Sequence, residues 1–313
     1  MKKKLTTLLL IMVMVLSLLT PALAVDDEQY LQQSDLAAFS EQVEGDEAVA
    51  MAVEEASDSA TGVTQQEAAR FLLFYAGMKE SQLGTYPDDY NAMAESVGLT
   101  KNIEWAPAEL CTVEEFNTML QNVQVLYDAM HKDVKQPLFV DGLAQPIFEY
   151  SDPTQGNLNE DGEIHDGVVR FCVYVETNYD TDGDGKLDLV KALVQLPRET
   201  LDGLKVPTIY EARPYITGCT DGSVPYVDGK YDLESMYSQP AKRTPAGTYT
   251  TTAAVENANP DDWYYWNEYE NMYDYEDLTW YDYYLVRGYA VVECGGLGTK
   301  GSDGFETCGT DLE

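Results

Sequence analysis

A glycine-rich turn, GGLGTKGSDG over residues 295–304, carries the residue types of two kinds of functional loop. Residues 296–301 match G-x-G-x-x-G, a pattern in which backbone N–H groups and a helix N-terminus hold a pyrophosphate. The residues that follow are glycines and acids without a helical period, so the context for a nucleotide fails. Residues 301–304 approach the nucleophile motif G-x-S-x-G, but Lys300 stands where that motif needs a glycine. We therefore expect no nucleotide site, and we expect Ser302 to be a turn residue.

A series of aspartates in NYDTDGDGKLD, residues 178–188, could bind a hard cation. The stretch from Asp180 to Asp188 matches the first nine positions of a calcium-binding loop, with carboxylates at alternate positions. The twelfth position should be a bidentate Glu and is Lys191, and strands rather than helices flank the loop. Two interpretations stay open: a weak calcium site at Asp180 to Asp188, or an Asp/Gly-rich hairpin turn. Apart from this calcium, no cofactor is expected.

An acidic aromatic run extends from Trp263 to Tyr284, and half of its residues are Trp or Tyr. Aromatic faces and carboxylates together suit an ammonium group, such as the free N-terminus of a peptide. The same residues also suit the packed wall of a pocket, because buried aromatics occur in any core. The two interpretations stay open.

Four apolar runs predict the strands that must position these groups: residues 168–177, 189–197, 206–212 and 289–294. The first two flank the aspartate turn and read as a hairpin. A long loop follows the third, to about residue 261. A helix is expected over residues 278–287, immediately before the fourth strand, which looks buried. This order of strands and helix predicts an α/β fold.

The region upstream is helical by pattern. Thr64 with Glu67 and Thr112 with Glu115 are capping boxes, which start helices by satisfying free backbone N–H groups. A shorter helical piece at residues 90–97 lies between them. Two T-x-x-E starts around a short helix resemble S-layer homology modules, which bind secondary cell-wall polymers. That resemblance, over residues 63–133, implies wall attachment. However, Gln65 and Val113 stand where the family has arginine, and a small helical domain is the alternative.

The first 62 residues indicate whether the protein stays in the cell or is exported. Lysines 2–4, an apolar stretch at residues 8–19 and the small-x-small site Ala22-Leu23-Ala24 predict a signal peptide over residues 1–24. An uncleaved anchor is the alternative. Residues 25–62 are acidic with few large apolar residues, and they read as a linker. The formal charge of the chain is -36, which excludes nucleic acid as a partner because phosphates would be repelled. We expect a secreted protein, and the odd number of cysteines leaves at least one thiol unpaired.

The second half of the sequence resembles the start of the catalytic domain of Xaa-Pro dipeptidyl-peptidases, the bacterial X-prolyl serine peptidases related to cocaine esterase. The stretches that carry the resemblance are DGLAQPIF, VYVETNYDTDGDGKLDLVK, VPTIYEARPY and RGYAVVECGGLGTKGSDGFETCG. The resemblance implies an incomplete α/β-hydrolase domain over residues 134–313, preceded by a small all-helical domain. It implies release of Xaa-Pro dipeptides from peptides with a free N-terminus, through an acyl-enzyme.

One functional residue follows from the resemblance. The family's oxyanion-hole tyrosine comes after a proline at the end of the third strand, and Tyr215 after Pro214 stands there. The nucleophile, the acid and the base would come later in the chain. The two histidines, His131 and His165, both precede the third strand. The resemblance therefore gives this chain an oxyanion donor and neither a nucleophile nor a base, and we expect the chain alone to be inactive and Glu313 to be a truncation point.

Two rival functions stay open. One is an esterase or acylase of the same superfamily, because most of the substrate pocket would lie outside this chain. The other is a non-catalytic wall-binding surface protein. For a finished protein, an acidic turn directly after a buried strand would leave that strand without neighbours, and such an apolar edge would aggregate.

Overall fold

The structure is a computed structural model that describes residues 29–41, 47–56, 62–151, 156–181, 183–212, 226–227, 230–231, 251–256, 258, 280–297 and 302–304. The chain divides into two compact units, residues 1–128 and 129–313, and each is described by itself. Among the described residues, no helix is both long enough and apolar enough to span a bilayer.

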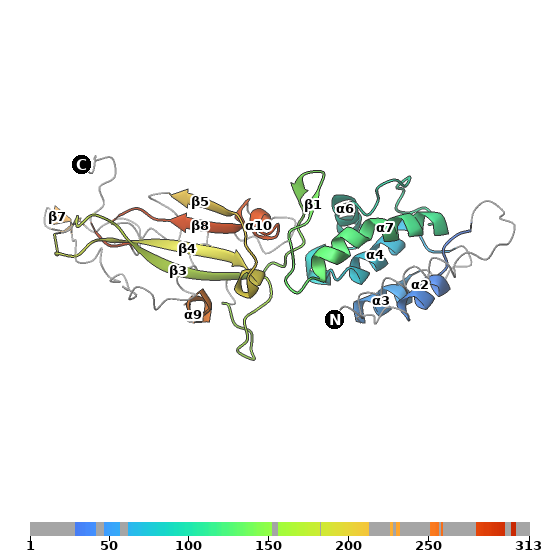
Figure 1. Cartoon of the computed structure of the whole chain (residues 1–313), viewed down its shortest axis with the longest axis horizontal. Helices are drawn as coiled ribbons and strands as arrows, with labels where there is room; N and C mark the ends of the chain where they lie inside the picture. Colours follow the sequence, from blue (N-terminus) through green and yellow to red (C-terminus); the bar gives the residue numbers. More distant parts are fainter. Residues whose placement is uncertain are drawn as a thin grey trace. The chain divides into compact units, whose positions relative to one another are not determined.

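The N-terminal unit is built from helices (Figure 1). In chain order they are α2 (Gln33–Ser40), α3 (Glu47–Glu55), α4 (Gln65–Tyr75), α5 (Glu80–Leu83), α6 (Asp88–Ser96) and α7 (Val113–Met130). Helix α4 packs against both α3 and α6, and α2 packs against α3. The helices predicted at Thr64, Tyr90 and Thr112 are confirmed, whereas α2, α3 and α5 were not predicted.

Three short extended segments meet at the centre of this unit in a ring of backbone hydrogen bonds. The N–H of Leu31 donates to the carbonyl of Cys111 (2.8 Å), that of Cys111 donates to Val63 (2.8 Å), and that of Val63 donates to Leu31 (2.8 Å). All three side chains are buried. Burial raises the pKa of the Cys111 thiol to about 12, so this thiol stays protonated near neutral pH. The ring ties together parts of the chain that are up to eighty residues apart.

A helix starts directly after each of the three extended segments. In each case, a carboxylate three residues after the cap residue accepts a hydrogen bond from the backbone N–H of that cap residue. The three bonds are Gln32 to Asp35 (2.9 Å), Thr64 to Glu67 (2.8 Å) and Thr112 to Glu115 (2.8 Å). The two predicted capping boxes are thereby confirmed. The third, at Gln32, escaped prediction because Gln and Asp replace the Thr and Glu of the pattern.

Part of the predicted linker is folded, so the linker prediction for residues 25–62 is wrong where the structure describes them. Helices α2 and α3 lie in this range, and Leu36 is fully buried. The ring of Phe39 makes edge contacts with Phe71 (5.8 Å between centroids), Tyr75 (5.3 Å) and Phe116 (6.3 Å). A few apolar side chains are sufficient here because α4 and α7 supply the rest of the core.

The C-terminal unit is organised around one mixed sheet. Its strands are β3 (Val168–Glu176), β4 (Leu189–Pro197), β5 (Thr208–Ala212) and β8 (Ala290–Cys294), in the spatial order β3-β4-β8-β5. Strand β4 pairs antiparallel with β3 on one side and with β8 on the other. Strand β5 pairs parallel with β8. The four predicted strands are confirmed to within two residues at each end. This unit also has two hairpins of two-residue strands: β1 (Phe139–Val140) with β2 (Leu143–Ala144), and β6 (Tyr226–Val227) with β7 (Lys230–Tyr231).

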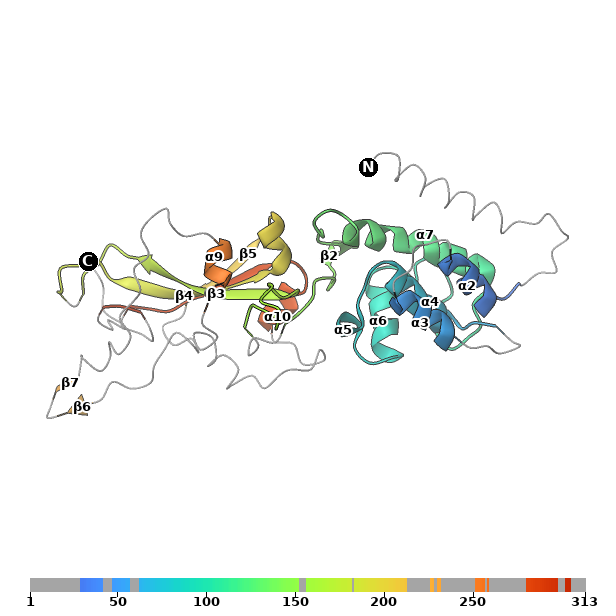
Figure 2. The same ribbon diagram turned by 90° about the horizontal axis from the view of Figure 1, so that it is seen from below.

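Two short helices cover opposite faces of the sheet (Figure 2). Helix α9 (Thr251–Glu256) places Val255 in a cluster with Val169 and Phe171. Helix α10 (Trp280–Leu285) places Tyr281 and Leu285 in a cluster with Val168 and Val291. Successive residues of β3 thus face different helices, as the pleat requires. Helix α9 lies within the stretch expected to be a loop, and α10 lies within the helix predicted for residues 278–287.

One sequence-based expectation about the sheet is wrong. We expected that, in a finished protein, the strand before the glycine-rich turn would lack neighbours, but β8 is interior and pairs with β4 on one side and β5 on the other. Among the described residues β5 pairs only with β8, and Thr208, Tyr210 and Ala212 of this strand are exposed. The crossover from β5 to β8 brings the fourth strand between the second and the third.

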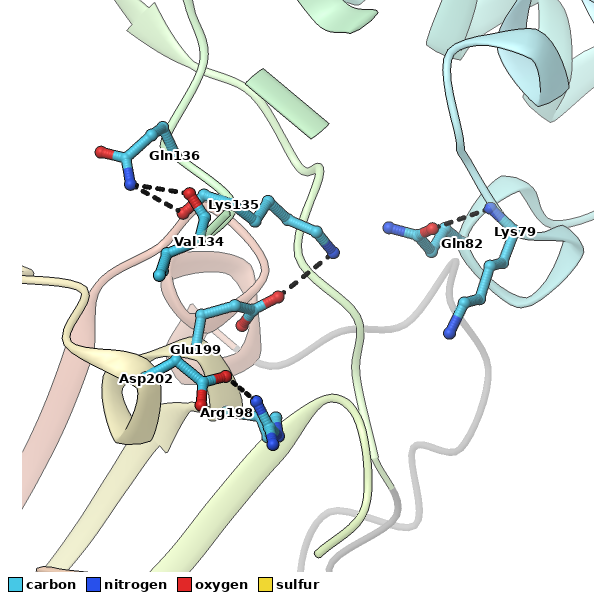
Figure 3. A network of polar contacts seen from close by, with 8 residues as sticks. All are labelled: Lys79, Gln82, Val134, Lys135, Gln136, Arg198, Glu199 and Asp202. Carbon is cyan, nitrogen blue, oxygen red and sulfur yellow. Dashed lines mark hydrogen bonds and ion pairs between the residues drawn. The ribbon is translucent and has the colours of Figure 1, made fainter. Parts of the chain in front are cut away.

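A 3₁₀ helix, η2 (Arg198–Asp202), follows β4 and contacts the segment that leads into the sheet. There Lys135 forms an ion pair with Glu199 (3.2 Å), in which both side chains are mostly buried (Figure 3). The same ammonium lies over the ring of Phe148 (5.6 Å). These contacts fix the segment from Val134 to Phe148 on this unit, at the end of the sheet opposite the carboxyl end of β8.

Candidate active site

The carboxyl ends of β5 and β8 lie side by side, because the two strands are parallel and Ala212 pairs with Cys294. In open α/β sheets, ligands bind at the carboxyl ends of parallel strands. The tip of the β3–β4 hairpin lies at the same end of the sheet, since Ala192 near the start of β4 pairs with Cys294. Tyr215, the expected oxyanion donor, follows β5 by three residues and lies outside the described residues.

The described ends of the glycine-rich turn, residues 295–297 and 302–304, lie along β4, and residues 298–301 lie outside the described residues. The N–H of Gly295 donates to the carbonyl of Lys191 (3.0 Å), and the N–H of Lys191 donates to Oγ of Ser302 (2.9 Å). The N–H of Asp303 then donates to the carbonyl of Leu189 (2.6 Å). Ser302 is buried and its hydroxyl is an acceptor for backbone. This contact gives Ser302 a structural role, and its interpretation as a turn residue stays a prediction.

Asp188 joins this turn to the hairpin. It is buried, and its Oδ2 accepts from the backbone N–H (2.8 Å) and the hydroxyl (2.6 Å) of Thr181. Gly304 packs directly on this pair, with a φ of +86° that favours glycine. A Cβ at Gly304 would come within 2.4 Å of the Asp188 carboxylate and 2.6 Å of the Thr181 hydroxyl. The hairpin and the turn can therefore make this contact only because residue 304 is a glycine, which has no side chain.

Replacing Gly304 with alanine is expected to destabilise the protein by about 2 kcal/mol more than replacing Gly185 with alanine, because only the former adds a steric clash. Gly185 is a matched control, since its φ of +84° is nearly the same and no atom lies within 4 Å of its would-be Cβ. Urea unfolding of both variants measures the difference. Equal losses for the two variants would show that the turn does not pack on Asp188.

The aspartates of the hairpin turn accept hydrogen bonds from the turn itself. Asp180 accepts from the N–H groups of Gly183 (2.9 Å) and Gly185 (3.0 Å), and Asp184 forms an ion pair with Lys186 (2.5 Å). In the part of the chain that the structure describes, which omits Asp182, no group of three His, Cys, Asp or Glu side chains is arranged to hold a metal ion.

Under α10, two carboxylates stand side by side at the same end of the sheet. Glu211 of β5 and Glu293 of β8 are in register on neighbouring parallel strands, so both point to the face that α10 covers. The hydroxyl of Tyr281 donates to Oε2 of Glu211. Burial, the bond to Glu211 and the charge of Glu293 all raise the pKa of Tyr281, so its hydroxyl remains a donor.

On the other face of β5, the exposed Tyr210 lies against the thiol of Cys294, which raises the pKa of that phenol. Within the described residues Cys294 forms no disulfide, and Cys308 lies outside them, so a disulfide between these two cysteines stays open. The two histidines are elsewhere: His165 precedes β3 at the opposite end of the sheet, and His131 follows α7. Of the aromatic run, the structure describes residues 280–284, which belong to α10.

Gln65 is one of the two residues that stand where the S-layer homology family has arginine. Gln65 is buried, and its amide donates to the carbonyl of Glu104 (3.1 Å) and to Oε1 of Glu115 (3.0 Å). Its Oε1 accepts from the N–H of Ala106 (2.8 Å). These bonds tie one capping box to the next. Gln65 is thus a structural tether and is not presented to a ligand.

Comparisons with known proteins support the resemblance. The family model described as X-Pro dipeptidyl-peptidase (S15 family) matches residues 182–313. An Xaa-Pro dipeptidyl-peptidase of Ligilactobacillus salivarius is 32% identical over 194 residues, which cover 58% of this chain and 21% of that protein. One of Lactiplantibacillus plantarum is 33% identical over 177 residues, or 56% of this chain and 20% of that protein. This chain therefore spans about a fifth of the length of these relatives.

A third match reaches into the helical unit. The Xaa-Pro dipeptidyl-peptidase of Lactobacillus delbrueckii subsp. lactis is 27% identical over 292 residues, which cover 84% of this chain and 33% of that protein. Residues 129–313 make up less than two thirds of the chain, so this alignment includes part of the N-terminal unit. The similarity therefore extends beyond the second half of the sequence, to which the stretches that carry the resemblance belong. The suspected family resemblance and the α/β fold class that it implies are confirmed.

Proposed function

We propose that the complete product of this gene is a secreted serine peptidase that releases Xaa-Pro dipeptides from peptides with a free N-terminus. The observation that carries the proposal is the family match over residues 182–313. That stretch holds β4, β5, β8, the glycine-rich turn and Tyr215. It includes the carboxyl ends of the parallel strands β5 and β8, and such strand ends are where ligands bind in open α/β sheets.

The proposed reaction proceeds through an acyl-enzyme. A serine hydroxyl adds to the proline carbonyl of the substrate, and its proton passes to a histidine base. Tyr215 donates its phenolic O–H to the oxyanion that forms at this step. Collapse of the intermediate breaks the C–N bond, and the base returns the proton to the leaving amine. Water then hydrolyses the ester. In this proposal, the serine, its acid and its base are supplied by residues that follow Glu313.

Substrate comparison separates this proposal from its closest rival, an esterase or acylase. The complete gene product is expected to hydrolyse an Xaa-Pro anilide at least about a hundredfold faster, in kcat/KM, than the matched Xaa-Gly anilide, because the prolyl pocket contributes binding in the transition state. N-acetylation of the Xaa-Pro anilide should abolish turnover, since a free ammonium is required. Faster turnover of a phenyl ester, with no preference for proline, would favour the esterase.

We propose that this reaction needs no metal ion. The described carboxylates of the hairpin already accept from Gly183, Gly185 and Thr181. Millimolar calcium is therefore expected to leave the melting temperature unchanged, because a ligand stabilises a fold only by binding to it. A rise in melting temperature that Asp184→Asn abolishes would instead establish a calcium site at Asp180 to Asp188.

We also propose export through cleavage after Ala24, on the strength of the N-terminal pattern. Wall attachment by the helical unit is the alternative role for residues 63–133. Buried Gln65 argues against it, and so does the scarcity of cations, since Arg70, Lys79 and Lys101 are the basic residues between residues 29 and 128. Export without attachment predicts that the protein begins at Val25 in the culture medium. Co-sedimentation with purified cell walls in physiological salt would contradict it.

A further inference from the structure

Residues 135–148, here called the 135–148 loop, close on themselves. Asp141 and Gly142 turn the chain with φ of +51° and +83°, the left-handed pair that a two-residue hairpin requires, and β1 pairs with β2 on either side of them. The two ends of the loop meet, because the ammonium of Lys135 lies 5.6 Å from the ring centroid of Phe148. Loops with close ends and internal packing are compact units of structure.

The first end of the 135–148 loop is attached to η2 by a buried ion pair. Nζ of Lys135 lies 3.2 Å from Oε1 of Glu199, and the two side chains are 14% and 16% exposed. The other carboxylate oxygen of Glu199 is buried and has no hydrogen-bond partner among the described residues. Removing one partner of a buried ion pair is strongly destabilising, because the other charge is left uncompensated. The attachment of this end therefore depends on the charge of Lys135.

The second end is attached to the turn between α10 and β8. The N–H of Phe148 donates to the carbonyl of Val286 (3.0 Å), and the Phe148 side chain is fully buried. Its ring lies directly on Gly288, where a Cβ would come within 2.6 Å of Cε2 of the ring. Gly288 has a φ of +82°, which favours glycine, and its N–H donates to the carbonyl of Leu285 at the end of α10 (3.0 Å). The ring and the turn are therefore fitted to each other.

We propose that Lys135 couples the two ends of the 135–148 loop, so that this loop and the turn between α10 and β8 open together as one cooperative unit. Lys135 contacts both Glu199 and the ring of Phe148. Phe148 in turn contacts Val286 and Gly288. Loss of the ion pair releases the ring, and the turn then loses its packing partner. Proteins open in such contiguous units at free energies below that of global unfolding. The inference concerns the fold and does not depend on the proposed function.

Native-state hydrogen exchange in the complete gene product tests the proposal first in the unmodified protein. Bonded amides of the loop, at Gln145 and Phe148, and of the turn, at Gly288 and Tyr289, are expected to share one opening free energy. Their protection should be at least about tenfold lower than that of residues 191–195, which lie on β4 between two paired strands. Equal protection of the loop, the turn and β4 would overturn the inference, because no separate unit would then exist.

Lys135→Met tests the coupling, with Lys132→Met as the matched control. Methionine keeps an apolar stem and removes the charge, so Glu199 loses its partner and Phe148 its cation. Protection of the loop and of the turn should fall together, by about tenfold or more, whereas replacement of the exposed Lys132 should change neither. Lys135→Arg should restore most of the protection, because a guanidinium also pairs with a carboxylate and stacks on a ring. A fall confined to the loop would contradict the proposal.

Gly288→Ala perturbs the same unit from its other end. The added Cβ would displace the ring of Phe148, and protection of Gln145 in the loop should therefore fall together with that of Tyr289 in the turn. Gly162→Ala is the control for backbone strain, since its φ is +79° and no atom lies within 4 Å of its would-be Cβ. If Gln145 stayed as protected in Gly288→Ala as in this control, the two ends would not open together. Should Lys135→Met fail to fold, Glu199→Gln, which removes the negative charge and keeps an acceptor, carries the same test.

Discussion

Replacing Tyr215 with phenylalanine in the complete gene product is expected to lower kcat on an Xaa-Pro anilide by about a hundredfold to a thousandfold. The phenol would donate to an oxyanion that exists only in the transition state, and removal of one such donor typically has an effect of this size. KM should change little, because the ground-state carbonyl makes no comparable bond. Steady-state kinetics over a range of substrate concentrations separates the two constants.

Tyr210→Phe is the matched control for that experiment. Tyr210 lies on β5, five residues before Tyr215, and is 63% exposed. Its hydroxyl faces the Cys294 side of the sheet, away from α10, so kcat should be unchanged. A Tyr215→Phe enzyme that retains more than about half of the wild-type kcat would remove Tyr215 from the oxyanion hole.

Replacing Phe39 with alanine is expected to destabilise the N-terminal unit by about 3–5 kcal/mol, the usual loss for removal of a buried phenylalanine. Phe39 is 8% exposed and contacts three aromatic rings on α4 and α7. Urea unfolding followed by far-ultraviolet circular dichroism measures the change, because this unit is helical.

Val125→Ala serves as the control, since Val125 lies on α7 and is 59% exposed. Its loss should stay within about 0.5 kcal/mol, as for most surface substitutions. If Phe39 belonged to a linker, its replacement by alanine would cause an equally small loss of stability. If Phe39→Ala were as mild as Val125→Ala, residues 29–56 would be a linker after all, and α2 and α3 would not belong to the folded core.

The strands were predictable because their sequences are rich in apolar residues and in the β-branched and aromatic residues that favour strands. Residues 189–197 gave the bounds of β4 without error, and Val168 was identified as the first residue of β3. The two Thr-based capping boxes were equally clear, because each shows the Thr and the Glu of the pattern at the required spacing of three residues. These elements depend on residues that are close together in the chain.

Elements whose buried side chains pack mainly against residues far away in the sequence were not predicted. Helix α2 has only Leu36 and Phe39 as buried residues, so its sequence looks like an acidic linker until α4 and α7 are in place. The third capping box was hidden because Gln32 and Asp35 are a rare substitute for the usual pair. The interior position of β8 could not be read from the chain order, since strand order depends on the crossover.

The site was predictable only in part for the same reason. For Ser302, a structural role could be predicted because Lys300 breaks the nucleophile motif. The pairing of Glu211 with Tyr281 could not, because seventy residues separate them and neither belongs to a motif. The signal that could have indicated it is the register of two parallel strands, in which a glutamate stands at the penultimate position of both.

The most direct test of the central claim is covalent labelling of the complete gene product with a fluorophosphonate, followed by mass mapping of the adduct. The proposed function predicts a single phosphonylated serine in a G-x-S-x-G sequence after Glu313, with loss of Xaa-Pro anilide hydrolysis in proportion to labelling. An adduct on Ser302, or full hydrolytic activity in protein that takes up no label, would contradict the account.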